Sequence, residues 1–496
     1  MPMSEDSIHK NNSVTPSEKY LKTLCDKAFL SLWSYPSVFR DQKESRNPEG
    51  KELCDLLVVF GKQIIIFSDK QCAFPRTGNL ELDWSRWFNR AVTKSAEQAW
   101  GAERWIRKHP DRIFLDRKCA HHFPIKLSEE SEMKIHIVVV SHEASARCTE
   151  ELGGSGSLML KSDMNDDKKI EPFVIPDLNP EKTFVHVLDD TTLDILLKTN
   201  NTISDFIAYL IKKENFFRSG KKIFASGEEE LLAHYLKNIN SQKEHDFVFD
   251  EKYNGISLIE GEWENFKNSQ QRKAQIEADR VSYFWDEFIE RFNQNALNGT
   301  QFYASHSGIE AAEKIMRFLA REPRLRRRLL ADGFLEHIHK SNPTLSSRRY
   351  ILPSNPGDPY YVLLLLPHPK NLTEEEYRKG RREILEAYCK ALKYRIPEAE
   401  DIIGIATEPE ILNGLSSEDA LYMNVRDWSE DLQEDTKKIM KILNIPEELL
   451  LVTRNSEDEY PEPKQIFQSN QLKNPRNKPC SCGSGLKWKR CHGKFF

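Results

Sequence analysis

The amino-acid sequence predicts an α/β protein of several domains. At 496 residues, the chain is longer than one hydrophobic core usually holds. Strand-like apolar runs alternate with helical patterns along most of it. We expect an N-terminal α/β core, a helical middle section, a C-terminal α/β unit and a small zinc-bound tail. The predicted segments are 1–16 (disordered), 17–133 (the core), 134–257 (an α/β extension), 258–347 (helical), 348–452 (α/β), 453–477 (a linker) and 478–496 (the tail).

The N-terminal core is predicted to run helix, strand, strand, helix. Residues 17–32 are helical by the spacing of their apolar residues. Two apolar runs, 53–60 and 63–67, are separated by Gly61 and Lys62, which is typical of a hairpin. Asp83 is expected to cap a helix over 84–108. The apolar side of that helix, which should pack against the sheet, consists of Trp84, Phe88, Ala91, Ala99 and Ala102.

The remaining chain gives further helix and strand signals. Residues 134–140, KIHIVVV, are the clearest strand. Further strands are expected at 157–161, 183–188, 360–366, 401–406 and 420–425. Helices are expected at 190–197, 203–215, 228–237, 373–394 and 429–443, and most of 258–340 reads as helical and highly charged.

Composition favours a cytoplasmic protein. No run of eighteen apolar residues occurs, so no membrane span is expected, and the first residues lack the apolar stretch of a signal peptide. Six cysteines lie singly within strand-like or helix-like patterns, which is typical of a reducing compartment. They are Cys25, Cys54, Cys72, Cys119, Cys148 and Cys389. The net charge of -5 averages over the domains and so decides nothing about nucleic acid.

The last residues of the chain predict a structural zinc site. Cys480 and Cys482 form one short ligand pair, and Cys491 and His492 form a second one. Zinc binds Cys sulfur and His nitrogen, and four protein ligands make a closed tetrahedral site. A segment this short cannot bury enough surface to fold alone, so Zn²⁺ would supply its folding energy.

The segment from Pro479 to Gly493, PCSCGSGLKWKRCHG, closely resembles the SEC-C motif. This motif occurs at the C-terminus of the translocation ATPase SecA and on many unrelated bacterial proteins, so the resemblance implies a docking module rather than a pathway. Seven basic residues and no acidic residue lie between Gln471 and Phe496. The tail would therefore bind phosphates or an acidic protein partner. The alternative is a solvated tail that only keeps the zinc site soluble.

The hairpin carries the residues that could perform chemistry. Asp55 opens an apolar run, which is an unusual place for a carboxylate. Strand alternation puts Ser68 and Lys70 on one face, near Asp55 across the hairpin. A half-buried acid and amine cost desolvation unless they pair or hold a metal. The pattern is compatible with a Mg²⁺ or Mn²⁺ site whose waters could attack a phosphate, or with a plain cross-strand ion pair.

This helix, hairpin and helix with Asp…xxLys resembles the PD-(D/E)XK nuclease superfamily over residues 17–116. The resemblance implies a restriction-endonuclease-like fold in which Asp55 holds a catalytic metal ion and Lys70 orients the attacking water. Gln71 matches a glutamine often found next in the family. It also implies a metal-binding Glu from the preceding helix, a position that Glu18 could fill. From the residues alone, Glu18 is equally a first-turn acid favoured by the helix dipole.

Ser68 departs from the family pattern because it stands where a second acid is expected. Some members carry Ser there and take the missing carboxylate from the next helix. In this chain Glu97 could supply it, and Arg86, Arg90 and Lys94 share its helix face and could bind phosphates. The alternative for Glu97 is an ion pair with a neighbouring base on a solvated helix.

We therefore expect a metal-dependent nuclease acting on DNA or RNA. The alternative is a non-catalytic adaptor for nucleic acid or protein with a degenerate nuclease fold. A run of arginines in the helical section could line a nucleic-acid path or be a solvated face neutralised by the acids around it. It consists of Arg321, Arg324, Arg326, Arg327 and Arg328, with Arg348 and Arg349.

Overall fold

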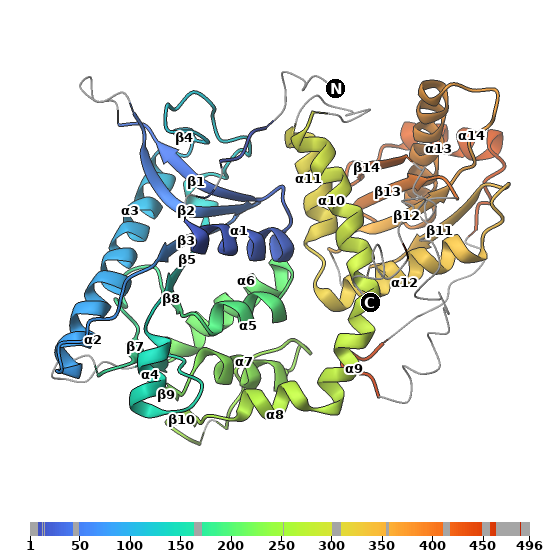
Figure 1. The fold of residues 1–496 in the computed structure, drawn as a ribbon. Coiled ribbons are helices and arrows are strands. Elements are labelled where there is room, and N and C mark those ends of the chain that lie inside the picture. The colour runs from blue at the N-terminus through green and yellow to red at the C-terminus, as the bar shows by residue number, and fades with distance from the viewer. Residues whose placement is uncertain are drawn as a thin grey trace. The chain divides into compact units, whose positions relative to one another are not determined.

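A computed structural model describes residues 8–11, 13, 15–42, 49–162, 171–250, 252–299, 309–353, 357–409, 417–448, 457–462 and 487. The chain forms two compact units. The first comprises residues 1–272 and 289–323, and the second comprises 273–288 and 324–496. Both contain β-strands and α-helices, so the predicted α/β multidomain class is confirmed (Figure 1).

The first unit is built on a six-stranded mixed sheet with the order β4-β1-β2-β3-β5-β8. Strands β1, β2 and β3 pair antiparallel in sequence order, and β4 joins β1 at the edge. Strands β5 and β8 then add in parallel to β3. The sheet strands are β1 (Ser34–Arg40), β2 (Lys51–Phe60), β3 (Gln63–Lys70), β4 (Ile113–Phe114), β5 (Lys134–Ser141) and β8 (Val185–Leu188). Strand β5, which the sequence analysis places in the 134–257 segment, is thus central to the same sheet as the hairpin.

Helices cover both faces of this sheet. Helix α1 (Pro16–Phe29) begins with a capping box in which Thr15 and Glu18 bond each other's backbone N–H groups. Phe29 of α1 packs against Phe67 of β3 and Phe206 of α6 (Ile203–Phe217). Helices α2 (Leu80–Phe88) and α3 (Lys94–Lys108) are joined by the π-helix η1 (Asn89–Thr93), and α3 contacts β2, β3 and β5. Figure 1 shows α3 along the left of the sheet.

A second, four-stranded sheet completes the first unit, with the order β10-β9-β6-β7. Its strands are β6 (Met159–Lys161), β7 (Val174–Pro176), β9 (Lys222–Ala225) and β10 (Gly255–Leu258). The remaining elements of this part are η2 (Glu130–Glu132), α4 (Ser145–Leu152), α5 (Thr192–Thr199), α7 (Glu228–Lys237) and α8 (Glu262–Asn268). The following helical section contains α9 (Gln270–Asp279), η3 (Arg280–Ser282), α10 (Tyr283–Leu297) and α11 (Ile309–Ala320).

The second unit has its own four-stranded sheet, with the order β11-β12-β13-β14. Strands β12 and β13 are parallel and are connected by the long helix α13, which packs on the sheet through Leu385, Cys389 and Leu392. The elements are α12 (Arg324–Lys340), β11 (Ser347–Ile351), β12 (Tyr360–Leu365), α13 (Glu374–Arg395), β13 (Asp401–Thr407), β14 (Glu418–Asn424) and α14 (Glu430–Ile442). None of the helices that the structure describes is both long and apolar enough to cross a bilayer.

Two details differ from the sequence-based expectations. The helix expected to start after Asp83 starts at Leu80, capped by Asn79, and buried Asp83 instead accepts hydrogen bonds from Thr77. Within the segment expected to be disordered, Lys10 donates to the Ser34 carbonyl at 2.7 Å. The Asn11 side chain likewise donates to main-chain carbonyls of the first unit. Part of this segment is therefore ordered by hydrogen bonds from its side chains.

Candidate functional site

The two strands of the predicted hairpin stop pairing at their open end. Their ladder runs from Phe60 opposite Gln63 to Leu56 opposite Phe67. Beyond that point β2 continues only along β1, and β3 continues along β5 to Lys70. We call this place the β2–β3 fork. It comprises Asp55 on β2 and Ser68, Asp69 and Lys70 on β3.

Asp55 takes the place of the missing ladder at the fork. The Asp69 N–H donates to Asp55 Oδ2 at 2.7 Å, so a side chain of β2 satisfies a backbone donor of β3. Burial raises the pKa of Asp55 to about 7, the Asp69 N–H opposes this rise, and the negative charges of Glu52, Asp69 and Glu18 add to it. No positive charge of a described residue therefore offsets the negative charge of the ionised Asp55 carboxylate. Such an environment favours the binding of a cation.

The residues opposite Asp55 leave polar groups unused. Continuing the register by one step places Asp55 opposite Ser68, so alternation puts both on the same face as Lys70, as predicted. Ser68 is 7% exposed, and Lys70 is exposed to solvent. Among the residues that the structure describes, the Asp55 Oδ1 atom, the Ser68 hydroxyl and the Lys70 ammonium make no hydrogen bond or ion pair. The alternative of a plain Asp55–Lys70 ion pair is thus not what the structure contains.

The two other predicted acids, Glu18 and Glu97, lie on different helices, α1 and α3. Glu18 serves in the capping box of α1, and its charge is close enough to raise the pKa of Asp55. Glu97 is exposed on α3, between residues that pack inward, such as Ala96 and Ala99. Within the described ranges, no three His, Cys, Asp or Glu side chains gather closely enough to hold a metal ion. Strand alternation thus puts Asp55, Ser68 and Lys70 on one face of the fork, and Glu97 lies on an exposed part of α3.

A chain of hydrogen bonds extends from the fork across the ends of the parallel strands. The side chain of Asp69 points away from Asp55 and is fully buried. Its Oδ1 bonds His142 Nε2 at 2.5 Å, and His142 Nδ1 bonds Asp190 Oδ1 at 2.6 Å. Asp190 also accepts the Glu143 N–H at 2.9 Å. Strands β3, β5 and β8 are thereby joined, each just at or after its carboxyl end, where α/β sheets commonly place functional groups.

His142 is held as a cation by this arrangement. Burial alone would lower the pKa of His142, but hydrogen bonds to Asp190 and Asp69 raise it to about 10. The same contact lowers the pKa of Asp190, against the effect of burial. An imidazolium with both N–H groups donated to carboxylates cannot accept a proton, so His142 is a fixed link and not a general base.

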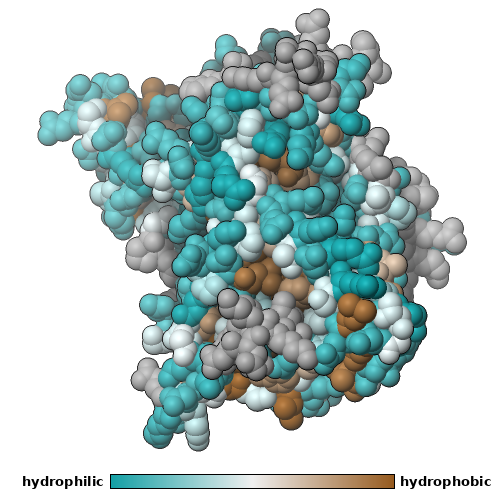
Figure 2. All heavy atoms as spheres, turned by 90° about the vertical axis from the view of Figure 1, so that its left-hand side faces the viewer, coloured by the Kyte–Doolittle hydropathy of each residue, from teal (hydrophilic) through white to brown (hydrophobic). Residues whose placement is uncertain are grey.

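The predicted phosphate-binding residues lie on a solvent-exposed helix face. Arg86, Arg90 and Lys94 are all exposed. Arg90 reaches the Ala73 carbonyl at 3.4 Å, three residues beyond Lys70, so it lies beside the end of β3. Figure 2 looks onto this side of the first unit, where hydrophilic residues dominate and hydrophobic ones occur in scattered patches. The π-helix between Arg86 and Lys94 inserts an extra residue in the helix, a feature frequent at functional sites.

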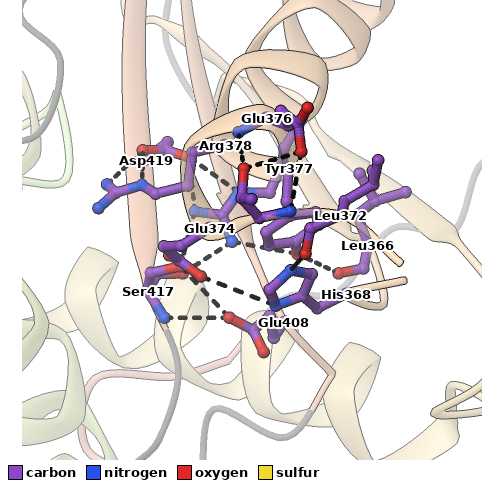
Figure 3. Close-up of polar contacts among 12 residues, drawn as sticks. Leu366, His368, Leu372, Glu374, Glu376, Tyr377, Arg378, Glu408, Ser417 and Asp419 are labelled. Carbon is purple, nitrogen blue, oxygen red and sulfur yellow. Dashed lines mark hydrogen bonds and ion pairs between the residues drawn. The ribbon is translucent and has the colours of Figure 1, made fainter. Parts of the chain in front are cut away.

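A second polar cluster lies in the other unit, at the carboxyl ends of β12 and β13 (Figure 3). Asp419 accepts from Arg378 at 2.6 Å and from Arg381 at 2.5 Å. Arg381 is fully buried, and its remaining N–H groups reach the Tyr377 hydroxyl and Ser417. Every donor of Arg381 is thus satisfied within the protein. The buried guanidinium of Arg381 and the carboxylate of Asp419 therefore form a closed hydrogen-bond network.

Three of the seven arginines in the predicted basic surface of the helical section are buried. Arg324 and Arg327 both bond Asp286, and Arg328 bonds Asp279. All three arginines are at most 8% exposed. Acids neutralise these three arginines, as one interpretation of the run expected, but inside the protein and not on a solvated face. Burial removes these guanidinium groups from contact with phosphates.

Sequence reasoning missed the Asp69–His142–Asp190 chain, although a signal for it was present. His142 directly follows the strand that ends at Ser141, and Asp189 and Asp190 directly follow Leu188. Polar residues that follow successive strands meet at one edge when the strands are parallel. The missing information was that β3, β5 and β8 are parallel neighbours.

Comparisons with known proteins concern the end of the chain and a minor part of its length. The chain carries a SEC-C motif. A family model described as "SEC-C motif" matches residues 476–494. The predicted zinc ligands Cys480, Cys482, Cys491 and His492 belong to this motif and lie outside the described residues.

The curated relatives of this chain are similar to it over a limited stretch. "Protein translocase subunit SecA" of Francisella tularensis subsp. novicida (strain U112) is 30% identical over 128 residues, which is 25% of this chain and 12% of that protein. SecA of Coxiella burnetii (strain RSA 493 / Nine Mile phase I) is 30% identical over 121 residues, 24% of this chain and 12% of that protein. The chain therefore spans about an eighth of these relatives. No solved structure matches it.

Proposed function

We propose that the first unit is a metal-dependent nuclease that hydrolyses phosphodiester bonds of DNA or RNA, and that the C-terminal zinc motif docks it to a partner. One observation carries the proposal. At the β2–β3 fork, an acid, a hydroxyl and an ammonium share a face, and Asp55 Oδ1, the Ser68 hydroxyl and the Lys70 ammonium make no hydrogen bond or ion pair with other described residues. Unused polar groups of complementary charge at the end of a sheet are suited to a phosphate and its counter-ion.

The donor set fits a Mg²⁺ or Mn²⁺ ion that the substrate helps to bind. Magnesium keeps several waters and is commonly held by one or two carboxylates together with substrate phosphates. Asp55 Oδ1 would be the first protein ligand, and Glu18, whose charge already acts on Asp55, is better placed than Glu97 to be the second. Such an ion, when bound, supplies Lewis acidity and lowers the pKa of its water.

The side chains of the fork divide the remaining work. Lys70 donates hydrogen bonds to a phosphate oxygen and stabilises the charge that develops there. The Ser68 hydroxyl can orient a water because it can both donate and accept. Asp55, with its pKa raised by burial to about 7, becomes fully ionised only above neutral pH. Arg90 and Lys94 bind flanking phosphates and position the strand without reading its sequence.

Cleavage of plasmid DNA and of a structured RNA with Mn²⁺ or Mg²⁺ tests the proposal. Lys70→Ala is expected to abolish cleavage, and Arg90→Ala with Lys94→Ala to weaken substrate binding. Lys134→Ala is the matched control, because Lys134 is an exposed lysine at the opposite end of the same sheet. Equal rates for Lys70→Ala and wild type would refute a hydrolytic role of the fork.

The second candidate is a non-catalytic adaptor with a degenerate nuclease fold. Two observations favour it, namely Ser68 in the place of an acid and the lack of a three-acid group among the described residues. The adaptor would bind nucleic acid through Arg90 and Lys94 without cleaving it. Its signature is retention of a labelled duplex in a filter-binding assay, unchanged by Lys70→Ala, with no product after long incubation with Mn²⁺.

The zinc tail is expected to act independently of the fork. Removing residues 478–496 should abolish partner or nucleic-acid docking and leave any cleavage activity intact. A loss of cleavage on a short oligonucleotide after this deletion would mean that the tail takes part in the reaction.

A further inference from the structure

We propose that His142 is a positioning residue for the β2–β3 fork: by joining Asp69 to Asp190, it holds the Asp69 N–H group against Asp55. This inference rests on the proposed function only for its catalytic consequence. The physical claim concerns the geometry of one amide and one carboxylate. It can be tested without any substrate.

The first step is that Asp69 has a buried side chain with one partner. Its carboxylate is fully buried, and Oδ1 bonds His142. The other oxygen, Oδ2, is buried and accepts no hydrogen bond. A buried carboxylate that lost its last partner would be driven towards water, because desolvation of an unpaired charge is costly. His142 is therefore what keeps this side chain inside.

The second step is that Asp69 bonds two different partners, one through its side chain and one through its backbone N–H group. The side chain faces His142, and the N–H faces Asp55 at 2.7 Å. A backbone movement at residue 69 that carried the carboxylate away from His142 would also withdraw the N–H from Asp55. The fork offers no β2 backbone carbonyl as a substitute, because the ladder ends at Leu56 and Phe67.

The third step is that His142 is itself fixed from two sides. Asp190 bonds its Nδ1 at 2.6 Å and is anchored by the Glu143 N–H. The His142 backbone N–H also donates to the Lys70 carbonyl at 3.1 Å. His142 thus bonds β3 twice, through its backbone N–H to Lys70 and through its ring to the side chain of Asp69. This continuous path links Asp190, beyond β8, to Asp55 on β2 through four neighbouring strands.

Hydrogen–deuterium exchange resolved to single amides tests the geometric claim. In His142→Gln, the Asp69 amide should exchange faster, while the amides of Ile64–Phe67 stay protected by their ladder partners on β2 and β5. Asp190→Ala should give a weaker effect of the same kind. His136→Gln is the control, since His136 is another buried histidine on β5 that bonds Gln63 at the far end of the strand. An unchanged Asp69 amide in His142→Gln, or faster exchange along all of β3, would overturn the inference.

Mn²⁺ binding to the same variants tests the catalytic consequence. Loss of a positioning partner commonly weakens metal affinity or activity by about 10- to 100-fold. His142→Gln should therefore bind Mn²⁺ more weakly than wild type by about this factor in an electron paramagnetic resonance titration, whereas His136→Gln should not. If wild type binds no Mn²⁺, the nuclease proposal fails while the exchange result still decides the role of His142. If wild type binds Mn²⁺ and His142→Gln binds it equally well, the positioning role fails alone.

Discussion

The two units place polar clusters at equivalent points of their sheets and treat an aspartate in opposite ways. In each unit the cluster lies at the carboxyl ends of parallel neighbours, β3 and β5 in one and β12 and β13 in the other. Asp419 lies between two arginines in the second unit. Asp55 in the first unit is surrounded by the charges of other acids. Only in the second cluster is the aspartate paired with positive charges.

This difference distinguishes a structural network from one suited to bind a ligand. A buried cluster in which the aspartate is paired with arginines and the buried guanidinium has all its donors satisfied has little left to offer a partner. A cluster that leaves an acid uncompensated, beside an unused hydroxyl and ammonium, is stable only because other contacts of the fold outweigh its cost. The same substitution, Asp→Asn, should therefore have opposite effects in the two places.

Asp419→Asn should give the larger effect and should destabilise the second unit. The substitution leaves Arg381 and Arg378 without their counter-charge, and breaking a buried ion pair costs about 3–5 kcal/mol. Urea unfolding at pH 7 followed by circular dichroism measures the change in the free energy of unfolding. Asp427→Asn, an exposed acid after β14, is the control and should change little. A neutral result for Asp419→Asn would show that the cluster is not the closed network described.

Asp55→Asn should stabilise the first unit by an amount that grows as pH rises from about 3.8 to about 7. The pKa of Asp55 is raised by burial to about 7, above its ordinary value near 3.8, so its contribution to stability is fully present below pH 3.8 and is lost as pH rises through 7. At pH 8.5 the folded protein holds a poorly compensated charge that asparagine lacks. Asparagine can still accept the Asp69 N–H, so we expect a gain on the order of 2 kcal/mol at pH 8.5.

Unfolding curves of wild type and Asp55→Asn at pH 5 and pH 8.5 check this sign. The advantage of the variant should shrink at pH 5, where the wild-type carboxyl is itself mostly neutral. Added Mn²⁺ should narrow the difference at pH 8.5 if the metal binds Asp55. A variant that is less stable than wild type at pH 8.5 would contradict the contrast between the two clusters.

The sequence was sufficient for local structure and for residues on a single hairpin. The turn at Gly61 and Lys62, the strands on either side and the shared face of Ser68 and Lys70 followed from alternation, because these contacts join residues close in sequence. Helices with clear periodicity, such as α7, were found with their observed bounds. The inward side of α2 and α3 was also correct, since Trp84, Phe88 and Ala99 are buried.

Contacts between distant segments could not be predicted in the same way. The Asp69–His142–Asp190 chain depends on which strands lie side by side, and no local pattern specifies that β5 pairs with β3. The role of Asp83 was misjudged because Asn79 is an equally good cap and begins the helix earlier. The run of arginines looked exposed because its partners, Asp279 on α9 and Asp286 on α10, come from other helices, and only the fold reveals these contacts.

Alkaline pH should weaken the first unit through His142, with a smaller effect than either aspartate variant. Its pKa is raised to about 10 by Asp190 and Asp69 despite burial, so the stabilisation is fully present below pH 6.5 and is lost as pH rises through 10. His142→Gln lacks this term. The stability difference between wild type and His142→Gln should therefore be on the order of 1–2 kcal/mol at pH 6 and fall towards zero near pH 10. A difference that is constant with pH would mean that the imidazole is not held as a cation.

Zinc removal should have the smallest effect on the two units, because all described strands of the three sheets lie before the SEC-C motif, which begins at residue 476. Cys480→Ser with Cys482→Ser should lower the zinc content measured by inductively coupled plasma mass spectrometry, since two of the four predicted ligands are lost. The free energy of unfolding should stay within about 0.5 kcal/mol of the wild-type value, as for changes outside a packed core. Cys25→Ser and Cys389→Ser, at buried cysteines of the two units, are the reverse control: they should destabilise the fold and leave the zinc content unchanged. A loss of unit stability in the tail variant would mean that the zinc motif packs on one of the units, and that the contrast between their clusters has to be measured with the tail removed.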